Sequence, residues 1–534
     1  MIAARVRGLN WRVYISLLVV LILIWGVIFE LAFGGHETSY GTMDMSGHVR
    51  GWLIPPLILV AVVMFGHAAI AGTSKQTQGN EKSTTDPVGA APALAATPTD
   101  ARFTLEIRGL GVVVDKYRQG ALLNRLDETG PKGTLLSQNP KDYPWPRNDR
   151  SFAADQREGN ALEYALPNGW VERWPIPTMV IGPARNEQDK DADRIEGHVV
   201  SARQKAGLGI TLFVQLGAIQ ANDSDSAIRT LFRTFEQHPD LPAVVVLVND
   251  GVWTRNYMGT PGTERPENGN SVPKQPDSIV ALLVSRKDRI DRDIRPYVVN
   301  VPYKINLNDT KYDVIKLWNY YWTQEKIFDK THPGVMTTDY WQKLAPGLES
   351  QVDNRGPGDF KPNPWVPIRW TDWQLKQYDD APLLGYLHRP VEVSFADEQG
   401  APLKRLARVA KLKDGWEQAM ATLPEGQAPE RVFFDPGSSS DSWIALTQAL
   451  HGNEQHLDLD DPEEGFNTAQ RVGDTGTASP WVQIGLAVMR GYAKGGTTAT
   501  VNLRNPNHAS IVMVSPPDDA YRQKHPQLFD YGVK

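Results

Sequence analysis

DSDSAIRTLFRTFEQHPDLPAVVVLVNDG, residues 223–251, is the stretch that decides the fold class. Residues 223–237 are expected to form an amphipathic helix that begins at the N-cap Asp223 and has one apolar face: Ile228, Leu231, Phe232 and Phe235. Pro239 and Pro242 stop this helix, and residues 243–248 (AVVVLV) follow as a buried strand. Another apolar strand, residues 210–216 (ITLFVQL), precedes the helix. Strand, helix and strand in this order predict an α/β sheet with parallel elements.

The same alternation extends in both directions along the chain. Towards the N-terminus, strands are expected at 103–115, broken at Gly109 and Gly111, and at 176–181, with helices at 120–127 and 189–205. A further strand is expected at 278–284. After Pro390 the predicted strands are 391–395 and 431–435, the predicted helices are 402–423, 441–450 and 480–492, and the last strands, 500–503 and 510–514, form an antiparallel hairpin. The sequence therefore predicts two α/β lobes.

The two lobes share a local pattern. In each, a very apolar strand follows a proline-marked turn and ends in an aspartate and then a glycine, as Asp250-Gly251 and as Asp435 with Gly437. This similarity is consistent with an ancient duplication and equally with two unrelated α/β units.

The predicted organisation has five parts: a transmembrane hairpin (1–75), a flexible linker (76–100), an N-terminal α/β domain (101–310), an aromatic and proline-rich connecting region (311–388) and a C-terminal α/β domain (389–534). The connecting region opens with a predicted helix over 311–329. Its tryptophans are interpreted either as core between the lobes or as anchors for a protein partner, because Trp dominates interface hot spots. The candidate protein-binding residues are Trp318, Trp322, Trp365, Trp370 and Trp373.

Two apolar stretches at the N-terminus predict the hairpin. Residues 13–33 are long enough to span a hydrocarbon core of ~30 Å, and 53–71 are just long enough, with Pro55 and Pro56 in the first turn. A re-entrant or interfacial helix is the alternative for the second stretch. Lys and Arg are in excess before the first stretch and after the second, which predicts a soluble part on the cytoplasmic side of a bacterial inner membrane. If the second stretch does not span, the soluble part lies on the opposite side.

Composition excludes several classes of site. The chain has 534 residues and no cysteine, so disulfides, thiolate nucleophiles and Cys-based zinc sites are excluded. A net charge of −6 provides no basic field for nucleic acid. No H-E-x-x-H or G-x-x-x-x-G-K-[ST] motif occurs, and Gly109-x-Gly111 lacks the third glycine of a dinucleotide site, so it is interpreted as a close backbone approach or a bulge. No catalytic, cofactor or metal residues are therefore predicted.

A hydrolase is the alternative function. No G-x-S-x-G motif occurs, but Ser438, Ser439 and Ser440 lie between a strand and a helix, and His451, His456 and His508 are available as bases. An N-cap and turn is the structural interpretation of these serines. Asp474-Thr475-Gly476-Thr477 has one copy of an aspartic-protease-like triplet where two are needed, and is interpreted as a surface turn.

Several stretches resemble a bacterial family, once defined only as a domain of unknown function, that serves as adapters for type VI secretion lipases. They are FTLEIRGLGVVVDKYRQGALLNRLDE (103–128), PKDYPW (140–145), RVFFDPGSSSDSW (431–443) and TATVNLRNPNHASIVMVSPP (498–517). The resemblance implies a non-enzymatic protein that captures a secreted phospholipase effector and delivers it to the secretion spike. The first strand and the final hairpin are also similar to the ends of thiolase and ketosynthase folds, which are duplicated α/β units. Those enzymes use a cysteine that this chain lacks.

The hypothesis is therefore a membrane-anchored adapter with no cofactor and no nucleic-acid partner. Its partners would be a lipase effector, the spike protein and the inner membrane.

Overall fold

The computed structural model describes residues 102–526 and 529, with gaps at 131, 167–174, 186–201, 203–211, 217–223, 266–267, 301–313, 329, 331–334, 353 and 452–456. The predicted membrane hairpin and linker, the N-cap Asp223 and nearly all of the predicted helix at 189–205 lie outside these residues. Among the helices that the structure describes, none combines the length and the apolar character needed to cross a membrane.

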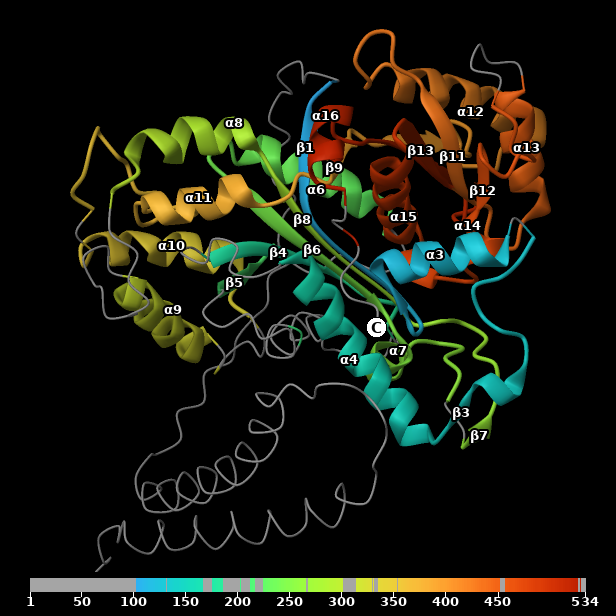
Figure 1. Cartoon of the computed structure of the whole chain (residues 1–534), viewed down its shortest axis with the longest axis horizontal. Helices are drawn as coiled ribbons and strands as arrows, with labels where there is room; N and C mark the ends of the chain where they lie inside the picture. Colours follow the sequence, from blue (N-terminus) through green and yellow to red (C-terminus); the bar gives the residue numbers. More distant parts are fainter. Residues whose placement is uncertain are drawn as a thin grey trace, which may run out of the picture. The chain divides into compact units, whose positions relative to one another are not determined.

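One mixed sheet runs through the described part of the chain (Figure 1). Its strands lie in the order β12-β11-β13-β14-β9-β1-β8-β6-β4-β5, with β10 paired to β14 and β2 paired to β1. The pairs β4–β5, β4–β6, β11–β12 and β11–β13 are parallel, and the other pairs are antiparallel. The predicted α/β class is therefore confirmed, with strands of both predicted lobes in the same sheet. The predicted domain boundaries stay predictions.

The strands of this sheet are β1 (Thr104–Val114), β2 (Tyr117–Arg118), β4 (Pro175–Ile181), β5 (Leu212–Gln215), β6 (Ala243–Asp250), β8 (Ser278–Ser285), β9 (Gly385–His388), β10 (Val391–Ser394), β11 (Pro429–Asp435), β12 (Gly465–Asn467), β13 (Thr497–Asn502) and β14 (His508–Ser515). A separate ribbon pairs β3 (Pro144–Trp145) with β7 (Gly269–Asn270). The principal helices are α3 (Gln119–Thr129), α4 (Arg147–Ala165), α6 (Ser226–Gln237), α7 (Val252–Tyr257), α8 (Lys287–Arg289), α9 (Val314–Phe328), α10 (Thr338–Glu349), α11 (Asp372–Asp380), α12 (Arg405–Met420), α13 (Ser440–Leu450), α14 (Thr468–Arg471), α15 (Ser479–Lys494) and α16 (Asp519–Lys524).

Strand β1 is covered closely on both faces. A β-carbon at Gly109 would lie 1.8 Å from the carbonyl oxygen of Ala165, and one at Gly111 would lie 1.8 Å from that of Ala161, so α4 contacts the backbone of β1 directly. A β-carbon at Gly485 in α15 would lie 2.4 Å from Val112 on the other face. The strand is continuous, with a register shift between Ile107 and Gly109. The two glycines thus mark a close approach and an irregularity, as predicted, and do not break the strand.

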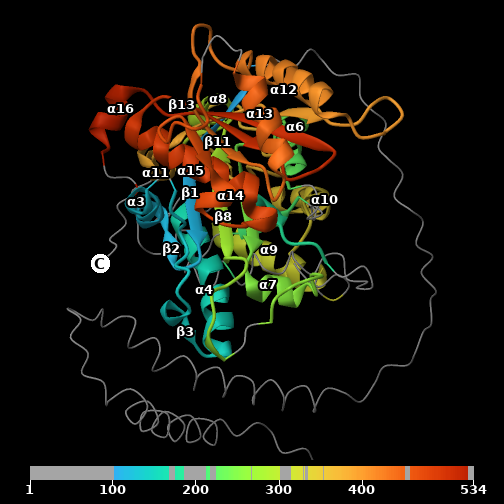
Figure 2. The same cartoon turned by 90° about the vertical axis from the view of Figure 1, so that its right-hand side faces the viewer.

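Helix α15 is the central helix of the body. Its side chains are buried from Ser479 to Tyr492, and it contacts β1 and β8 as well as β11, β13 and β14. A helix that is buried on all sides needs mostly apolar or small residues around its circumference, and in α15 the exceptions include Gln483 and Arg490. On the opposite face of the C-terminal strands, α12 and α13 cover a second apolar cluster that includes Val432, Phe434 and Val501. Figure 2 shows these helices on the outside of the body.

Helices α9 and α10 belong to the aromatic connecting region and contribute large rings to the main core. Tyr321 and Trp341 are buried, and their ring centroids lie 6.0 Å apart. The indole of Trp341 donates to the carbonyl of Pro364 at 2.7 Å. The core of this region is rich in aromatic side chains and is continuous with the core of the sheet.

Candidate functional site

Two buried aspartates lie at the carboxyl ends of two strands that are separated in the sheet by β13, β14, β9, β1 and β8. Asp250 ends β6 and Asp435 ends β11, and both contact the segment that leads into α15. Asp250 accepts a hydrogen bond from the backbone amide of Thr477, and Asp435 accepts one from the hydroxyl of Ser479. We call the polar groups around Asp250 and Asp435 the seam. Because ligands of α/β proteins bind outside the carboxyl ends of strands, the seam is the first candidate for a functional site.

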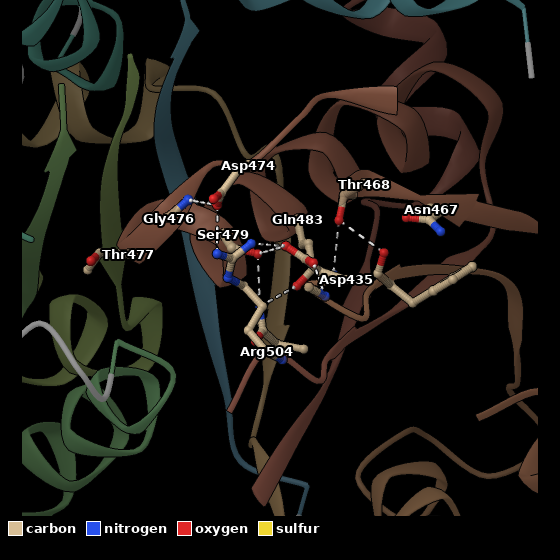
Figure 3. Close-up of polar contacts among 12 residues, drawn as sticks. Asp435, Asn467, Thr468, Asp474, Gly476, Thr477, Ser479, Gln483 and Arg504 are labelled. Carbon is tan, nitrogen blue, oxygen red and sulfur yellow. Dashed lines mark hydrogen bonds and ion pairs between the residues drawn. The ribbon is translucent and has the colours of Figure 1, made fainter. Parts of the chain in front are cut away.

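The carboxylate of Asp435 is fully buried and has several donors (Figure 3). Besides Ser479, it accepts from the amide of Gly437 at 2.7 Å and from Arg504 at 3.4 Å. Arg504 also reaches Asp474 at 2.6 Å. The amide of Asn502 donates to the Ser479 hydroxyl at 2.9 Å, so that hydroxyl is held from two sides. Gln483 adds hydrogen bonds to the carbonyls of β11 and β13.

The carboxylate of Asp250 has a different partner. Arg255 donates to it at 2.8 Å, and both side chains are almost completely buried. Burial raises the pKa of Asp250 above its ordinary value, and the guanidinium of Arg255 opposes that increase. Arg255 also lies 3.9 Å from Asp277, which pairs with Arg157. Arg157 reaches Asp115 at 3.2 Å, so a chain of buried charges connects the seam to the middle of α4.

This seam borders a cavity of about 430 Å³ that is lined by polar groups of both halves, including Asp250, Asp474, Asn502 and Arg504. The groups are already hydrogen-bonded to one another. Ser479 and Asp435 are completely buried and neither is among the residues that line the cavity, so the Ser479 hydroxyl is not accessible to a substrate in this arrangement. The arrangement fixes the strand ends and the start of α15, and it offers a structural explanation for the shared Asp-Gly pattern.

One of the three serines proposed for a hydrolase has a structural role. Ser439 caps α13, because its hydroxyl accepts from the amide of Ser442 at 3.2 Å. His508 pairs with Asp225 at 3.0 Å, and His451 lies at the exposed end of α13, while His456 is outside the described residues. Among the residues that the structure describes, no hydrogen bond joins Ser438, Ser439 or Ser440 to a histidine. The triplet at Asp474 lies at the seam, with Thr475 buried, and is therefore more than the predicted surface turn.

Metal ligands also fail to gather. Within the described ranges, no group of three or more His, Asp or Glu side chains is placed to hold a metal ion. The acidic run at 458–464 folds back on itself, since Glu464 accepts from the amide of Asp458 at 2.7 Å.

The five predicted anchor tryptophans differ in exposure. Trp365 and Trp370 are each 1 % exposed and belong to the core, so their rings are not available at the described surface. Trp318 on α9 is 39 % exposed, and Trp322 and Trp373 are partly buried. Trp318 contacts Trp322 edge to face, with ring centroids 6.1 Å apart. The role of these residues in protein binding stays a prediction.

A second group of exposed rings was not anticipated from the sequence. We call it the α4–α7 aromatic surface: Trp145 in β3, Phe152 in α4, and Trp253 and Tyr257 in α7, which are 38–65 % exposed. Trp145, together with the neighbours Ala153 and Val252, lines a cavity of about 220 Å³. Both cartoon views place β3, α4 and α7 next to one another (Figures 1 and 2). One signal existed in the sequence, because Trp253 and Tyr257 have the i, i+4 spacing of one helix face.

Comparison with protein families identifies the chain. Residues 103–269 match the family model described as type VI lipase adapter protein Tla3, N-terminal, and residues 384–516 match that described as type VI lipase adapter protein Tla3, C-terminal. Together the matches cover more than half of the chain. The chain belongs to the Tla3 family of type VI lipase adapters. The Tla3 matches include β6 and β11 with both buried aspartates, and they leave α9, α10 and α11 outside.

Solved structures of ketosynthases are similar to this Tla3-family chain at low identity. The ketosynthase from module 1 of the bacillaene synthase of Bacillus amyloliquefaciens is 8 % identical, with 79 % of this chain and 77 % of that chain covered and a TM-score of 0.42. The ishigamide ketosynthase/chain length factor is 9 % identical, with 78 % and 99 % covered and a TM-score of 0.40. Scores this low establish neither a duplication nor an activity for the chain.

Proposed function

We propose that this protein is a non-enzymatic adapter that binds a lipase effector of a type VI secretion system. The observation that carries the proposal is the match to both parts of the lipase adapter family, over residues 103–269 and 384–516. The geometry of the strand ends supports it, because their polar side chains hold one another and Ser439 of the 438–440 turn caps a helix.

The α4–α7 aromatic surface is the site we propose for the lipase. Exposed Trp and Tyr side chains are typical of interface hot spots, and one of these rings, Trp145, lines a cavity. All four of its residues lie within the N-terminal family match, whereas Trp318 and Trp322 lie in the region that neither family model covers. A function shared by the family is expected to use residues that belong to the shared part. Arg150 stiffens this surface by bonding both to Ser271 at 2.7 Å and to the carbonyls of Tyr143 and Gly269.

Anchoring and delivery complete the proposal. The apolar stretches 13–33 and 53–71 would hold the protein in the inner membrane, with the described body on the cytoplasmic side. The linker at 76–100 would let the body search for the lipase near the membrane and present it to the secretion spike.

The test is binding of the detergent-solubilised full chain to its cognate lipase, measured by calorimetry. Trp253→Ala should weaken binding by roughly tenfold or more, as expected for a hot spot. Trp443→Ala is the matched control, because Trp443 is 39 % exposed, compared with 43 % for Trp253, and lies on α13. Trp318→Ala tests the α9 alternative. Unchanged affinity in Trp253→Ala and Trp145→Ala would reject the proposed surface, and absence of any lipase binding by the folded chain would reject the adapter function.

A further inference from the structure

A polar cavity of about 190 Å³ lies between β11, β12 and the carboxyl ends of α3, α14 and α15. Its charged lining consists of Arg431, Arg471, Arg490, Lys494, Asp127 and Glu463. Four cations against two carboxylates leave two positive charges in a small space, in a chain whose net charge is −6. The helices around it are seen together in Figure 1.

Arg471 is the one cation of this lining that forms no ion pair with the residues that the structure describes. It is 6 % exposed, donates to the carbonyl of Leu126 at 2.6 Å and lies 4.1 Å from the ring centroid of Phe466. Its Nε is buried and has no hydrogen-bond partner among the described residues. Burial lowers the pKa of Arg471, and the nearby Arg490 lowers it further. A buried guanidinium without an anion is costly, so an anionic partner is expected.

The other cations have protein partners that are easily displaced. Arg490 pairs with Asp127, whose side chain is 51 % exposed, and Lys494 pairs with Glu463, whose side chain is 72 % exposed. Arg431 donates to the carbonyl of Gly495 at 2.7 Å and to the largely exposed Glu430. Exposed carboxylates bind such cations only weakly. The cations can therefore exchange these partners for a ligand without unfolding.

Helix carboxyl ends account for part of this arrangement. Arg471 and Arg431 each bond a carbonyl at or near the end of a helix, where a cation is favoured. One hydrogen bond to a carbonyl does not neutralise a guanidinium, and it leaves the Nε of Arg471 without an acceptor. Stabilisation of helix ends is thus the alternative explanation that an experiment must separate from ligand binding.

We propose that this cavity binds a phosphate group. Arg471 has no counter-ion among the described residues and the other three cations pair with exposed carboxylates, so an anionic phosphate can replace those carboxylates, and its oxygens can accept from several guanidinium groups at once. Arg471 supplies the free donor, Arg490 and Arg431 converge from α15 and β11, and Lys494 lies at the exposed edge. The proposal does not depend on lipase binding, because the cavity and the α4–α7 aromatic surface are lined by different residues.

The experiment measures thermal unfolding and calorimetric binding of the full chain with inorganic phosphate, glycerol 3-phosphate and, at matched ionic strength, chloride. Both phosphates are expected to raise the melting temperature, and chloride is not. Tighter binding of glycerol 3-phosphate would indicate a phosphate ester such as a lipid headgroup, and tighter binding of inorganic phosphate would indicate a free anion. Absence of an effect of either phosphate would overturn the proposal.

Three variants separate binding from stability. Arg471→Gln removes the charge and keeps a polar side chain, so phosphate affinity should fall by roughly tenfold or more. If Arg471→Gln does not fold, Lys494→Gln at the edge should weaken binding by roughly threefold. Arg405→Gln is the control, since Arg405 is exposed and pairs with Asp441 away from the cavity. A phosphate response that survives both cavity substitutions would show that the arginines only stabilise helix ends.

Discussion

The turns that follow β6 and β11 share one sequence pattern, an aspartate and then a glycine. They differ in which partner is local in the sequence, the cation that pairs with the aspartate or the cap of the following helix. After β6, the cation that pairs with the carboxylate is local, because Arg255 is five residues beyond Asp250, whereas the cap of α7 is distant: Asp277 accepts from the amide of Val252 at 2.6 Å. After β11 the cap is local, provided by Ser439, and the cation that pairs with Asp435, Arg504, comes from far along the chain.

This difference shows what a strand-Asp-Gly pattern specifies. The pattern places a buried carboxylate at the end of a strand. The cation that pairs with this carboxylate and the cap of the following helix come from whichever residues the fold places nearby. The two carboxylates also differ in how firmly their cations are held. The side chain of Arg255 is 6 % exposed, and that of Arg504 is 27 % exposed with a second carboxylate, Asp474, beside it. Removal of the carboxylate charge at Asp250 and at Asp435 should therefore lower the free energy of unfolding by different amounts.

The largest effect is expected from Asp250→Asn. This substitution keeps the shape of the side chain and leaves Arg255 buried without its nearest anion, which should lower the free energy of unfolding by about 3–5 kcal/mol. Urea unfolding followed by circular dichroism measures it. The double variant Asp250→Asn with Arg255→Met removes both charges and should recover most of the loss; a double variant as unstable as the single one would contradict the charge-pair explanation.

A smaller effect is expected from Asp435→Asn in the same assay. Arg504 keeps Asp474 at 2.6 Å and is accessible to water, so the loss is limited to charge-assisted hydrogen bonds, about 1.5–3 kcal/mol. The test is which of the two substitutions, Asp250→Asn or Asp435→Asn, lowers the free energy of unfolding more. If Asp435→Asn costs more than Asp250→Asn, the contacts of Asp435 with Ser479 and Gly437 outweigh the burial of Arg255, and the comparison must be reversed.

The two turns also show how far the sequence alone can predict this molecule. The helix at 226–237, the strand at 243–250 and the final hairpin follow from local periodicity and were predicted. Helix α4 was not predicted, because its buried side has small residues such as Ala154 and Ala161, and its position depends on glycines in β1. Strand β9 has only four residues, yet it lies between β14 and β1.

Contacts between residues that are distant in the sequence could not be predicted from local sequence patterns. The serine cap at Ser439 was visible as a possibility in its own turn. The Asp435–Ser479 and Asp250–Thr477 contacts join residues 44 and 227 positions apart, and no spacing rule reports them. Exposure is equally non-local: Trp318 and Trp370 look alike in the sequence, and only the folded chain buries one of them.

Acidification tests whether the strands on the two sides of β9 unfold as one unit. His388 lies in β9, which joins β14 of the C-terminal part to β1 of the N-terminal part. Its ring bonds the Thr422 carbonyl at 3.1 Å and the Ser515 hydroxyl at 2.8 Å, and burial lowers its pKa to about 4. The unfolded chain, with an ordinary histidine pKa, binds this proton more readily, so stability falls as pH drops from about 6.5 towards 4. The loss between pH 7 and pH 5 should be about 2 kcal/mol.

The measurement is urea unfolding at both pH values, with probes in each half. His388→Gln should reduce the pH dependence by that amount, whereas His451→Gln, at an exposed position, should leave it unchanged. Two separate transitions, with only one sensitive to His388, would show that the halves fold independently in spite of their common sheet.

The smallest effect concerns the caps themselves. Ser439→Ala removes the only side chain that caps α13 among the described residues, and should cost about 1 kcal/mol, whereas Ser438→Ala at the exposed neighbouring position should cost almost nothing. Labelling with a fluorophosphonate probe provides an independent readout of the same serines. Since Ser439 accepts a backbone hydrogen bond and no histidine is described beside it, neither the wild type nor either variant should be labelled. Labelling that disappears in one serine variant would mean that this turn, unlike the one after β6, carries a nucleophile.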